Sequence, residues 1–265
     1  MVTTPSSDPT VSHWHGQYSF ALRQLVMKDF RTRYRNMSLG IFWSLLNPLI
    51  MMGVLTFVFT QVFPTTRRAF PVFVLCGLIP YNFFALAWSS GTGSLLDSSG
   101  LVKKVPVPRE IIPIASVLSN CLHVFIQFGL LLIFLFIYGF PVNRYWAILP
   151  VVWGFYVLFI IGMVLATSAL NIYVRDTRYV VESVNTVLFW LVPIFYGGEM
   201  IKPEFVEIYS LNPIAAIVQA TRNILMEGRA PAYSLLTKLC LSSMLVFAVG
   251  WTVFQRLKHR VYDYI

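Results

Sequence analysis

The sequence predicts an all-α integral membrane protein with six transmembrane helices, an N-terminal amphipathic interface helix, and short outer re-entrant helices between spans five and six. Hydrophobic residues make up 57% of the 265 residues and charged residues only 12%, whereas an average soluble domain has roughly 25% charged residues. Apolar runs of about 20 residues, the length that crosses a bilayer core, recur along the chain. The cations behind the net charge of +9 stand at the ends of these runs, which favours anionic membrane lipids over nucleic acid as their partners.

The N-terminal part of the chain divides into two segments before the first span. Residues 1–11 are rich in Ser, Thr and Pro, which predicts a mobile tail. Residues 12–36 place Tyr18, Leu22, Leu25 and Phe30 at three- and four-residue steps among basic residues, which predicts a cytoplasmic amphipathic helix in the membrane interface. The opening residues show no basic and apolar regions of a cleavable signal peptide, so we expect the first span to direct insertion.

Residues 37–265 are predicted to form one transmembrane domain. The six apolar runs give spans at about 39–63, 70–93, 113–138, 145–170, 180–196 and 235–254. With the N-terminus inside, thirteen of the 20 Lys and Arg fall on the cytoplasmic side, so the positive-inside rule predicts that both termini are cytoplasmic.

The loop from Asp97 to Ile114 is the most unusual connection in the chain. Its three prolines, Pro106, Pro108 and Pro113, cannot all occupy one regular helix, so the loop has a constrained shape. Its sequence also places the apolar pair Leu101 and Val102 beside Lys103 and Lys104, a pattern that suits docking into a groove of a soluble partner. The alternative is that the cations only set membrane orientation.

The segment between spans five and six contains strong signals for the start and the end of a helix. Asn212 is a good N-cap, Pro213 suits the first helical position, and Gly228 suits the stop. The helix between them has about 14 residues and is therefore too short to span, which predicts re-entrant or surface helices on the outer side.

Several kinds of chemistry have no signature in the sequence. It contains no G-x-x-x-x-G-K-[ST] phosphate loop and no H-E-x-x-H or C-x-x-C metal motif, so we expect neither an ATP site of that kind nor a metal site in this chain. Cys76, Cys121 and Cys240 lie in apolar runs and are interpreted as small buried hydrophobic residues. Glu182, the one acidic residue within a span, either pairs with Arg178, caps a helix or carries protons.

Span three contains a polar stripe on one helix face. Ser116, Asn120, His123 and Gln127 recur at three- and four-residue steps, so they share a face that must contact protein or a water-filled path. The stripe therefore either joins helices by hydrogen bonds or lines a conduit.

Five motifs in order resemble the membrane subunit of bacterial ABC exporters for O-antigen, capsule and teichoic acid polysaccharides. They are RYRNMSLGIFWSLLNPL (33–49), GLIPYNFF (77–84), LVKKVPVPREIIPIASVLS (101–119), NIYVRDTRYVVESVNTVLFWLVPIFY (171–196) and LNPIAAIVQATRNILMEG (211–228). The resemblance implies a permease in the bacterial inner membrane, without enzymatic activity of its own, that forms a homodimer. It also implies two copies of a soluble subunit that binds ATP and magnesium, and a lipid-linked polysaccharide as cargo.

The resemblance also implies roles for particular residues. Leu101, Val102, Lys103 and Lys104 would form a coupling helix, and Arg109 and the cytoplasmic residues Arg175, Asp176 and Arg178 would add further contacts to the ATPase. Arg31, Arg33 and Arg35 are candidates for binding a pyrophosphate head group, because guanidinium groups bind phosphate through paired hydrogen bonds. Pro213, Gln219 and Arg222 are candidates for an outer gate.

Three alternatives remain compatible with parts of the sequence. An ABC exporter of a drug or simple lipid would share the motifs that specify the fold. A membrane-embedded glycan-transferring enzyme would need a catalytic set of carboxylates, which the acidic residues do not form in the sequence. A passive channel would need no docking loop.

Overall fold

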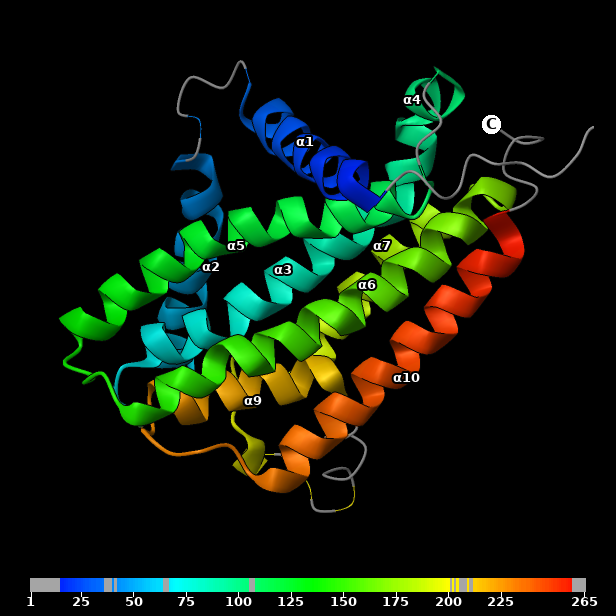
Figure 1. Cartoon of the computed structure of the whole chain (residues 1–265). Coiled ribbons are helices and arrows are strands. Elements are labelled where there is room, and N and C mark those ends of the chain that lie inside the picture. The colour runs from blue at the N-terminus through cyan, green and yellow to red at the C-terminus, as the bar shows by residue number, and fades with distance from the viewer. Residues whose placement is uncertain are drawn as a thin grey trace, which may run out of the picture.

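The computed structural model confirms an all-helical membrane protein (Figure 1). It describes residues 15–35, 40, 42–63, 67–104, 108–200, 202, 204, 209 and 212–258, except the side chains of 15–17, 102–104 and 199. The predicted tail at 1–11 lies outside these residues. Within them, five helices are long and apolar enough to cross a membrane, at Phe42–Val62, Phe70–Asp97, Ile111–Ile137, Arg144–Tyr173 and Tyr233–Leu257. Each overlaps one of the predicted spans.

Helix α3 (Phe70–Asp97) is the centre of the bundle. It packs against α2 (Phe42–Phe57), α5 (Ile111–Ile137), α6 (Leu149–Tyr173), α7 (Thr177–Leu191) and α9 (Pro213–Leu225). Most of its side chains are buried, as expected of a helix that is apolar on all sides. The helix continues past the predicted end at residue 93, because Thr92 and Ser94 donate hydrogen bonds to the carbonyls of Trp88 and Gly91 and so tolerate the apolar surroundings.

Helices α6 and α10 (Tyr233–Leu257) form the most extensive contact between two helices. A Cβ atom on Gly250 would lie 2.0 Å from the carbonyl oxygen of Gly162, and one on Gly162 would lie 2.6 Å from Cα of Phe247. The absence of side chains at these positions therefore lets the two backbones touch, a common device of membrane helices. The Tyr173 hydroxyl donates to the Leu257 carbonyl, so the two helices end side by side and run parallel.

Because α6 and α10 are parallel, the chain that connects them must pass from one end of the bundle to the other. The chain leaves α6 at one end of the bundle and must begin α10 at the other, as Figure 1 shows. Helix α7 makes the first part of this passage, but its 15 residues cover only about 22 Å of a hydrocarbon core of about 30 Å. The fifth predicted span, 180–196, thus corresponds to α7 and a non-helical extension, and a count of six spans stays a prediction.

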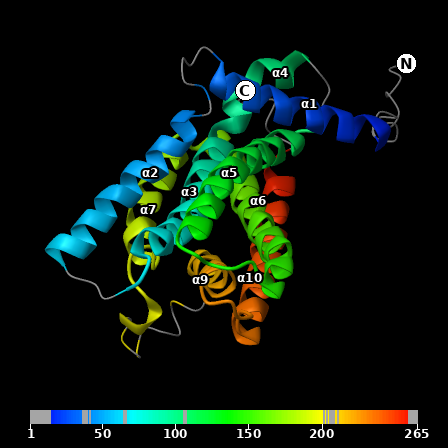
Figure 2. The same ribbon diagram turned by 90° about the vertical axis from the view of Figure 1, so that its left-hand side faces the viewer.

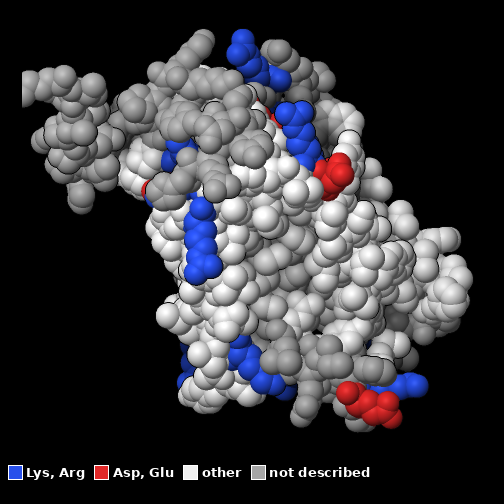
Figure 3. All heavy atoms as spheres, turned by 90° about the vertical axis from the view of Figure 1, so that its right-hand side faces the viewer, with Lys and Arg blue, Asp and Glu red and all other residues white. Residues whose placement is uncertain are grey.

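The two ends of the bundle carry different elements. Helix α1 (His15–Tyr34), the short helix α4 (Ser99–Lys104) and the last turns of α6 and α10 lie at one end, which we call the α4 end. Helix α9, the 3₁₀ turn η3 (Arg144–Ile148) and the start of α10 lie at the other, the α9 end. On the face in Figure 3, Lys and Arg side chains lie near the top and bottom and along the left side between them, and most of the remaining described surface is uncharged.

Helix α1 lies across the α4 end, crosswise to the long helices (Figure 2). Its partly buried residues include Tyr18, Leu22, Leu25, Phe30 and Tyr34, and pairs of exposed residues at 19–20, 23–24, 27–28 and 31–32 separate the partly buried positions. The helix packs mainly against α5, and its amphipathic character stays a prediction. Its position in a membrane interface remains a prediction.

Candidate functional site

The predicted coupling residues all belong to the α4 end. The chain from 99 to 104 forms helix α4, which projects beyond α3 (Figure 1). Leu101 is partly buried, and the side chains of Val102, Lys103 and Lys104 lie outside the described part. Arg175, in the turn between α6 and α7, is exposed.

The start of α7 adds charge to this end. Asp176 and Arg178 are exposed, and the Arg178 Nε atom lies 3.8 Å from the Glu182 carboxylate. The structure thus shows the first of the interpretations of Glu182, a solvent-exposed ion pair with Arg178. Such a pair contributes little to stability, which leaves both groups available to a partner.

Arg109 has a contact inside the chain. Its guanidinium donates a hydrogen bond to the carbonyl of Lys258, just beyond the end of α10. Arg109 therefore joins the start of α5 to the end of α10, a link that the sequence could not show. Its predicted role in coupling remains a prediction.

The polar stripe of α5 forms two hydrogen-bonded clusters between helices. Ser116 and Asn120 are buried and bond to Ser90 of α3, with 2.9 Å between Asn120 Nδ2 and Ser90 Oγ. Ser90 was not among the predicted functional residues, because no local pattern in the sequence pairs it with α5.

The second cluster joins three helices. The Tyr34 hydroxyl of α1 lies 2.6 Å from Nδ1 of His123 and 2.8 Å from the Ser44 hydroxyl of α2. Gln127 Nε2 donates to the Ser44 carbonyl and lies 3.1 Å from His123 Nε2. In the single chain the stripe therefore joins helices by hydrogen bonds, as the first of its two interpretations predicts. Its role in lining a conduit stays a prediction.

The three arginines proposed for a head group lie in the last turns of α1 and just beyond it. Arg31 and Arg35 are exposed and Arg33 is partly buried. Burial lowers the pKa of the Arg33 guanidinium, while Tyr34 and Asp29 raise it. Since arginine stays protonated in proteins, all three present positive charge at the α4 end.

Helix α9 begins and ends at the residues that the sequence predicts. The Asn212 side chain accepts a hydrogen bond from the Ile214 N–H, Pro213 occupies the first turn, and Gly228 has φ of +62°. The helix is surrounded by α3, α6 and α10, and nearly all of its residues are buried. It is therefore enclosed by protein; a re-entrant course in the membrane remains a prediction.

The three candidate gate residues differ in their surroundings. Gln219 is exposed and Pro213 is partly buried. Arg222 is only 6% exposed. It donates hydrogen bonds to the carbonyls of Phe73, Pro193, Ile194 and Tyr196, the shortest at 2.5 and 2.7 Å.

Arg222 thus fastens the chain after α7 to the start of α3. Burial lowers the pKa of Arg222 to about 9, partly offset by Cys76, so the side chain is still charged at neutral pH. Gly77 completes the junction, because a Cβ there would lie 2.9 Å from the Ile194 backbone. A movable gate would have to break these bonds, so the structure favours a fixed support at this position.

Replacing Arg222 with lysine is expected to lower the stability of the folded protein. A single ammonium group cannot reach the same set of carbonyls, and each lost bond to a charged donor costs about 1.5–3 kcal/mol, so we expect a loss of roughly 2–4 kcal/mol. Thermal unfolding in detergent measures this loss. The matched control is Arg144→Lys, which affects an exposed arginine bonded to Tyr145. Equal midpoints for the two variants would show that the Arg222 bonds are dispensable.

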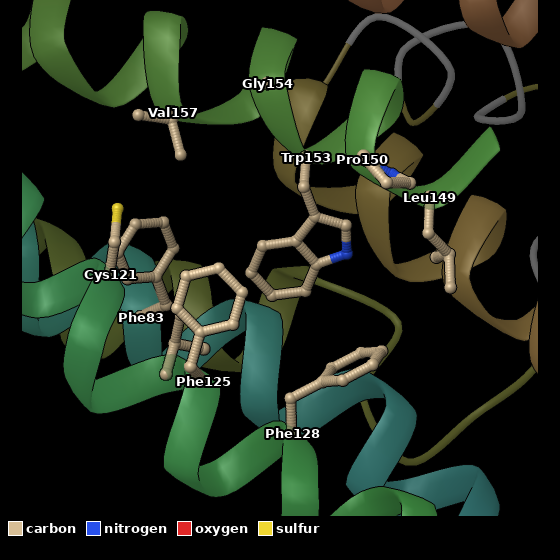
Figure 4. Close-up of a pocket in the computed structure, with 10 residues that line it drawn as sticks. Phe83, Cys121, Phe125, Phe128, Leu149, Pro150, Trp153, Gly154 and Val157 are labelled. Carbon is tan, nitrogen blue, oxygen red and sulfur yellow. The ribbon is translucent and has the colours of Figure 1, made fainter. Parts of the chain in front are cut away.

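Two of the cavities in the described part of the chain lie near candidate site residues. One, of about 320 Å³, lies among α3, α5 and α6 and is lined by apolar and aromatic side chains, including Phe125, Phe128 and Trp153 (Figure 4). Its lining suits hydrocarbon and offers little for sugar hydroxyls. The other, of about 400 Å³, lies at the α9 end and is lined by several cations.

These features define the class of the protein. In the described part of the chain, five helices are of spanning length, which indicates a multi-pass membrane protein. The chain belongs to the ABC-2 type transporter family, whose model matches residues 21–226.

Characterised relatives match almost the whole chain. An O-antigen export system permease protein RfbA of Klebsiella pneumoniae is 30% identical over 239 residues, covering 88% of this chain and 90% of the relative. A protein of the same name from Myxococcus xanthus is 27% identical over 241 residues (90% and 93%). The polysialic acid transport protein KpsM of Escherichia coli is 24% identical over 238 residues (87% and 91%).

Proposed function

We propose that this chain is the permease half of an ATP-driven ABC exporter that moves a lipid-linked polysaccharide from the cytoplasmic to the outer side of the bacterial inner membrane. The observation that carries the proposal is the match over nearly full length to permeases named for O-antigen export and polysialic acid transport. Membership of the ABC-2 family supports the transport mode.

In this proposal the α4 end is cytoplasmic. Both termini lie on that side, and a separate subunit that binds ATP and magnesium docks there on α4 and on the exposed turn at Arg175. ATP closes two such subunits on each other. Because their contact with α4 differs between the open and closed forms, ATP binding shifts the permease between two arrangements.

The exposed face of α7 supports a homodimer around a shared path. Only Val181 and Asn185 of this helix are buried, whereas Ser183, Thr186 and several apolar side chains, among them Val187 and Trp190, are exposed. Polar groups at membrane depth avoid lipid and face protein or water. A second copy of the chain facing α7 across a hydrated path satisfies this requirement.

Cysteine labelling tests the exposure of α7. In a variant with Cys76, Cys121 and Cys240 replaced by alanine, we expect Thr186→Cys to react with a membrane-impermeant maleimide. The control Val181→Cys should be protected, since Val181 is 2% exposed and packs inward. Protection of both positions would contradict a hydrated path along α7.

The proposal as a whole is tested by purification of the tagged chain in mild detergent. We expect it to bring down a soluble ATPase in equal molar amount, and to elute at the size of two copies of each chain. Recovery of the permease alone would contradict the proposal.

A further inference from the structure

The cavity of about 320 Å³ among α3, α5 and α6 lies at the depth of the hydrocarbon core. The residues that α5 contributes to its lining fall between Cys121 and Phe128, around the middle of this 27-residue helix. Phe83, the lining residue from α3, is likewise close to the middle of its helix. Both helices are long enough to cross a membrane, so their middle residues lie far from either interface.

Trp153 of α6 forms one wall of the cavity. The centroid of its indole ring lies 6.0 Å from those of Phe83 and Phe128, and 6.1 Å from that of Tyr156, which is fully buried. Figure 4 shows Trp153 reaching from α6 toward Phe125 and Phe128 of α5. At these distances aromatic rings attract one another, so the wall is firmly packed and resists collapse into the space beside it.

The cavity opens at the surface of the bundle. Phe125 is 69% exposed, and Pro150 and Gly154, which line the cavity from α6, are exposed as well. Figure 2 shows α7, the helix proposed above to face a second copy of the chain, on the opposite side of α3 from α6. A second copy placed against α7 therefore leaves the mouth of the cavity facing lipid.

An apolar space at this depth is unfavourable when it is empty. Side chains around a void lose the dispersion contacts that a filled space provides. Water does not fill it well, because a buried water molecule needs about two to four polar partners. An engineered apolar cavity of about 150 Å³ stays dry and binds benzene, and the volume of this cavity is roughly twice as large.

We propose that the cavity binds one fatty acyl chain of a bilayer phospholipid, with the middle of the chain against Trp153. The solvent at this depth is hydrocarbon, so acyl chains are the apolar groups present at the mouth. Lipid tails and side chains are similarly apolar, and the preference for the site therefore comes from close packing. The cavity lies on a different face of α5 from the polar stripe, so the site is independent of a conduit and of the cargo proposed above.

The chain offers a matched pair of glycines to test the site. Gly154 and Gly129 both lie in spans, and a Cβ atom on either would meet no heavy atom of the described residues within 4 Å, apart from the backbone of its own helix. Gly154 lines the cavity and Gly129 does not. Gly154→Leu therefore fills the cavity, whereas Gly129→Leu adds the same side chain elsewhere. Cys121→Leu fills the cavity from α5 and replaces Gly154→Leu should that variant accumulate poorly.

The first measurement is the thermal unfolding midpoint in a steroid-based detergent, which has no alkyl chain to enter the cavity. Palmitoyl-oleoyl phosphatidylcholine should raise the midpoint of the wild type and of Gly129→Leu to a plateau. Gly154→Leu should already unfold at a higher temperature without lipid, since filling a cavity stabilises a protein, and should respond less. Dihexanoyl phosphatidylcholine should have no effect, because its short chains end well before the middle of a core about 30 Å thick. An equal response of all three proteins to the long-chain lipid overturns the proposal.

The second measurement locates the chain in a bilayer. The three proteins are reconstituted with phosphatidylcholine that carries a diazirine at the middle of one acyl chain, and mass spectrometry maps the adducts formed by light. We expect adducts on Trp153 in the wild type and Gly129→Leu and their loss in Gly154→Leu, while the exposed Leu241 and Leu245 of α10 are labelled equally in all three. Adducts on Phe125 without Trp153, as for lipid that only passes over the surface, contradict the site. So does protection of both residues, which would place another protein over the mouth. Co-purification of the ATPase tests the transport function separately.

Discussion

Replacing Leu101 and Val102 together with aspartate is expected to abolish export and to remove the ATPase from the purified permease. If α4 docks in an apolar groove, two carboxylates there must be desolvated without a partner. Hot-spot residues of an interface each contribute at least about 2 kcal/mol, so loss of two such residues predicts an affinity lower by about a thousandfold. The amount of ATPase bound to immobilised permease measures this loss.

The matched control for this experiment keeps the pair apolar. Leu101→Met with Val102→Ile changes shape but little volume, a kind of exchange that proteins usually tolerate. We expect it to retain the ATPase. Gel filtration of both variants establishes that the permease itself is folded, since α4 projects from the bundle. Normal ATPase binding by the aspartate variant would show that α4 is not the docking element.

Replacing Gly250 with leucine is expected to prevent accumulation of correctly packed protein. The first atom of the new side chain would lie 2.0 Å from the Gly162 carbonyl oxygen and 2.6 Å from its carbon. These are backbone atoms of a long helix, so α6 and α10 would have to separate along their contact. Overpacking costs about 1–3 kcal/mol where side chains can adjust, and we expect a larger loss here, visible as aggregation in detergent gel filtration.

Gly129 of α5 provides the control for Gly250. Apart from the surrounding backbone of α5, no heavy atom of the described residues lies within 4 Å of a Cβ built at this position, and alanine is favoured over glycine in a helix by about 0.5–1 kcal/mol. Gly129→Ala should therefore be as stable as the wild type or slightly more stable. A monodisperse Gly250→Leu variant with an unchanged unfolding midpoint would show that the α6 and α10 contact differs from the one described.

The long apolar helices were predictable because their signal is local. A run of about 20 apolar residues is specified by the bilayer itself, and caps such as Asn212 act on their own helix. The fifth span was harder, because Pro193 follows α7 and ends its helical pattern. The passage continues there as buried, non-helical chain that Arg222 holds in place, and no local pattern in the sequence predicts it.

The roles of single polar residues were less predictable. The spacing of Ser116, Asn120, His123 and Gln127 correctly placed them on one face, but their partners Tyr34, Ser44 and Ser90 come from three other helices. The same applies to Arg109 and the Lys258 carbonyl, which are far apart in the sequence. A sequence indicates that such groups need a partner; only the packing of the helices identifies it.

The most direct test of the proposed export function uses inside-out membrane vesicles that contain this chain and its ATPase. A radiolabelled lipid-linked polysaccharide is supplied on the exposed cytoplasmic face, and a glycan hydrolase is then added outside. We expect ATP to make the polysaccharide resistant to the hydrolase, and we expect this resistance to disappear without ATP or without the permease. Resistance that forms equally in the absence of ATP or of this chain would contradict it.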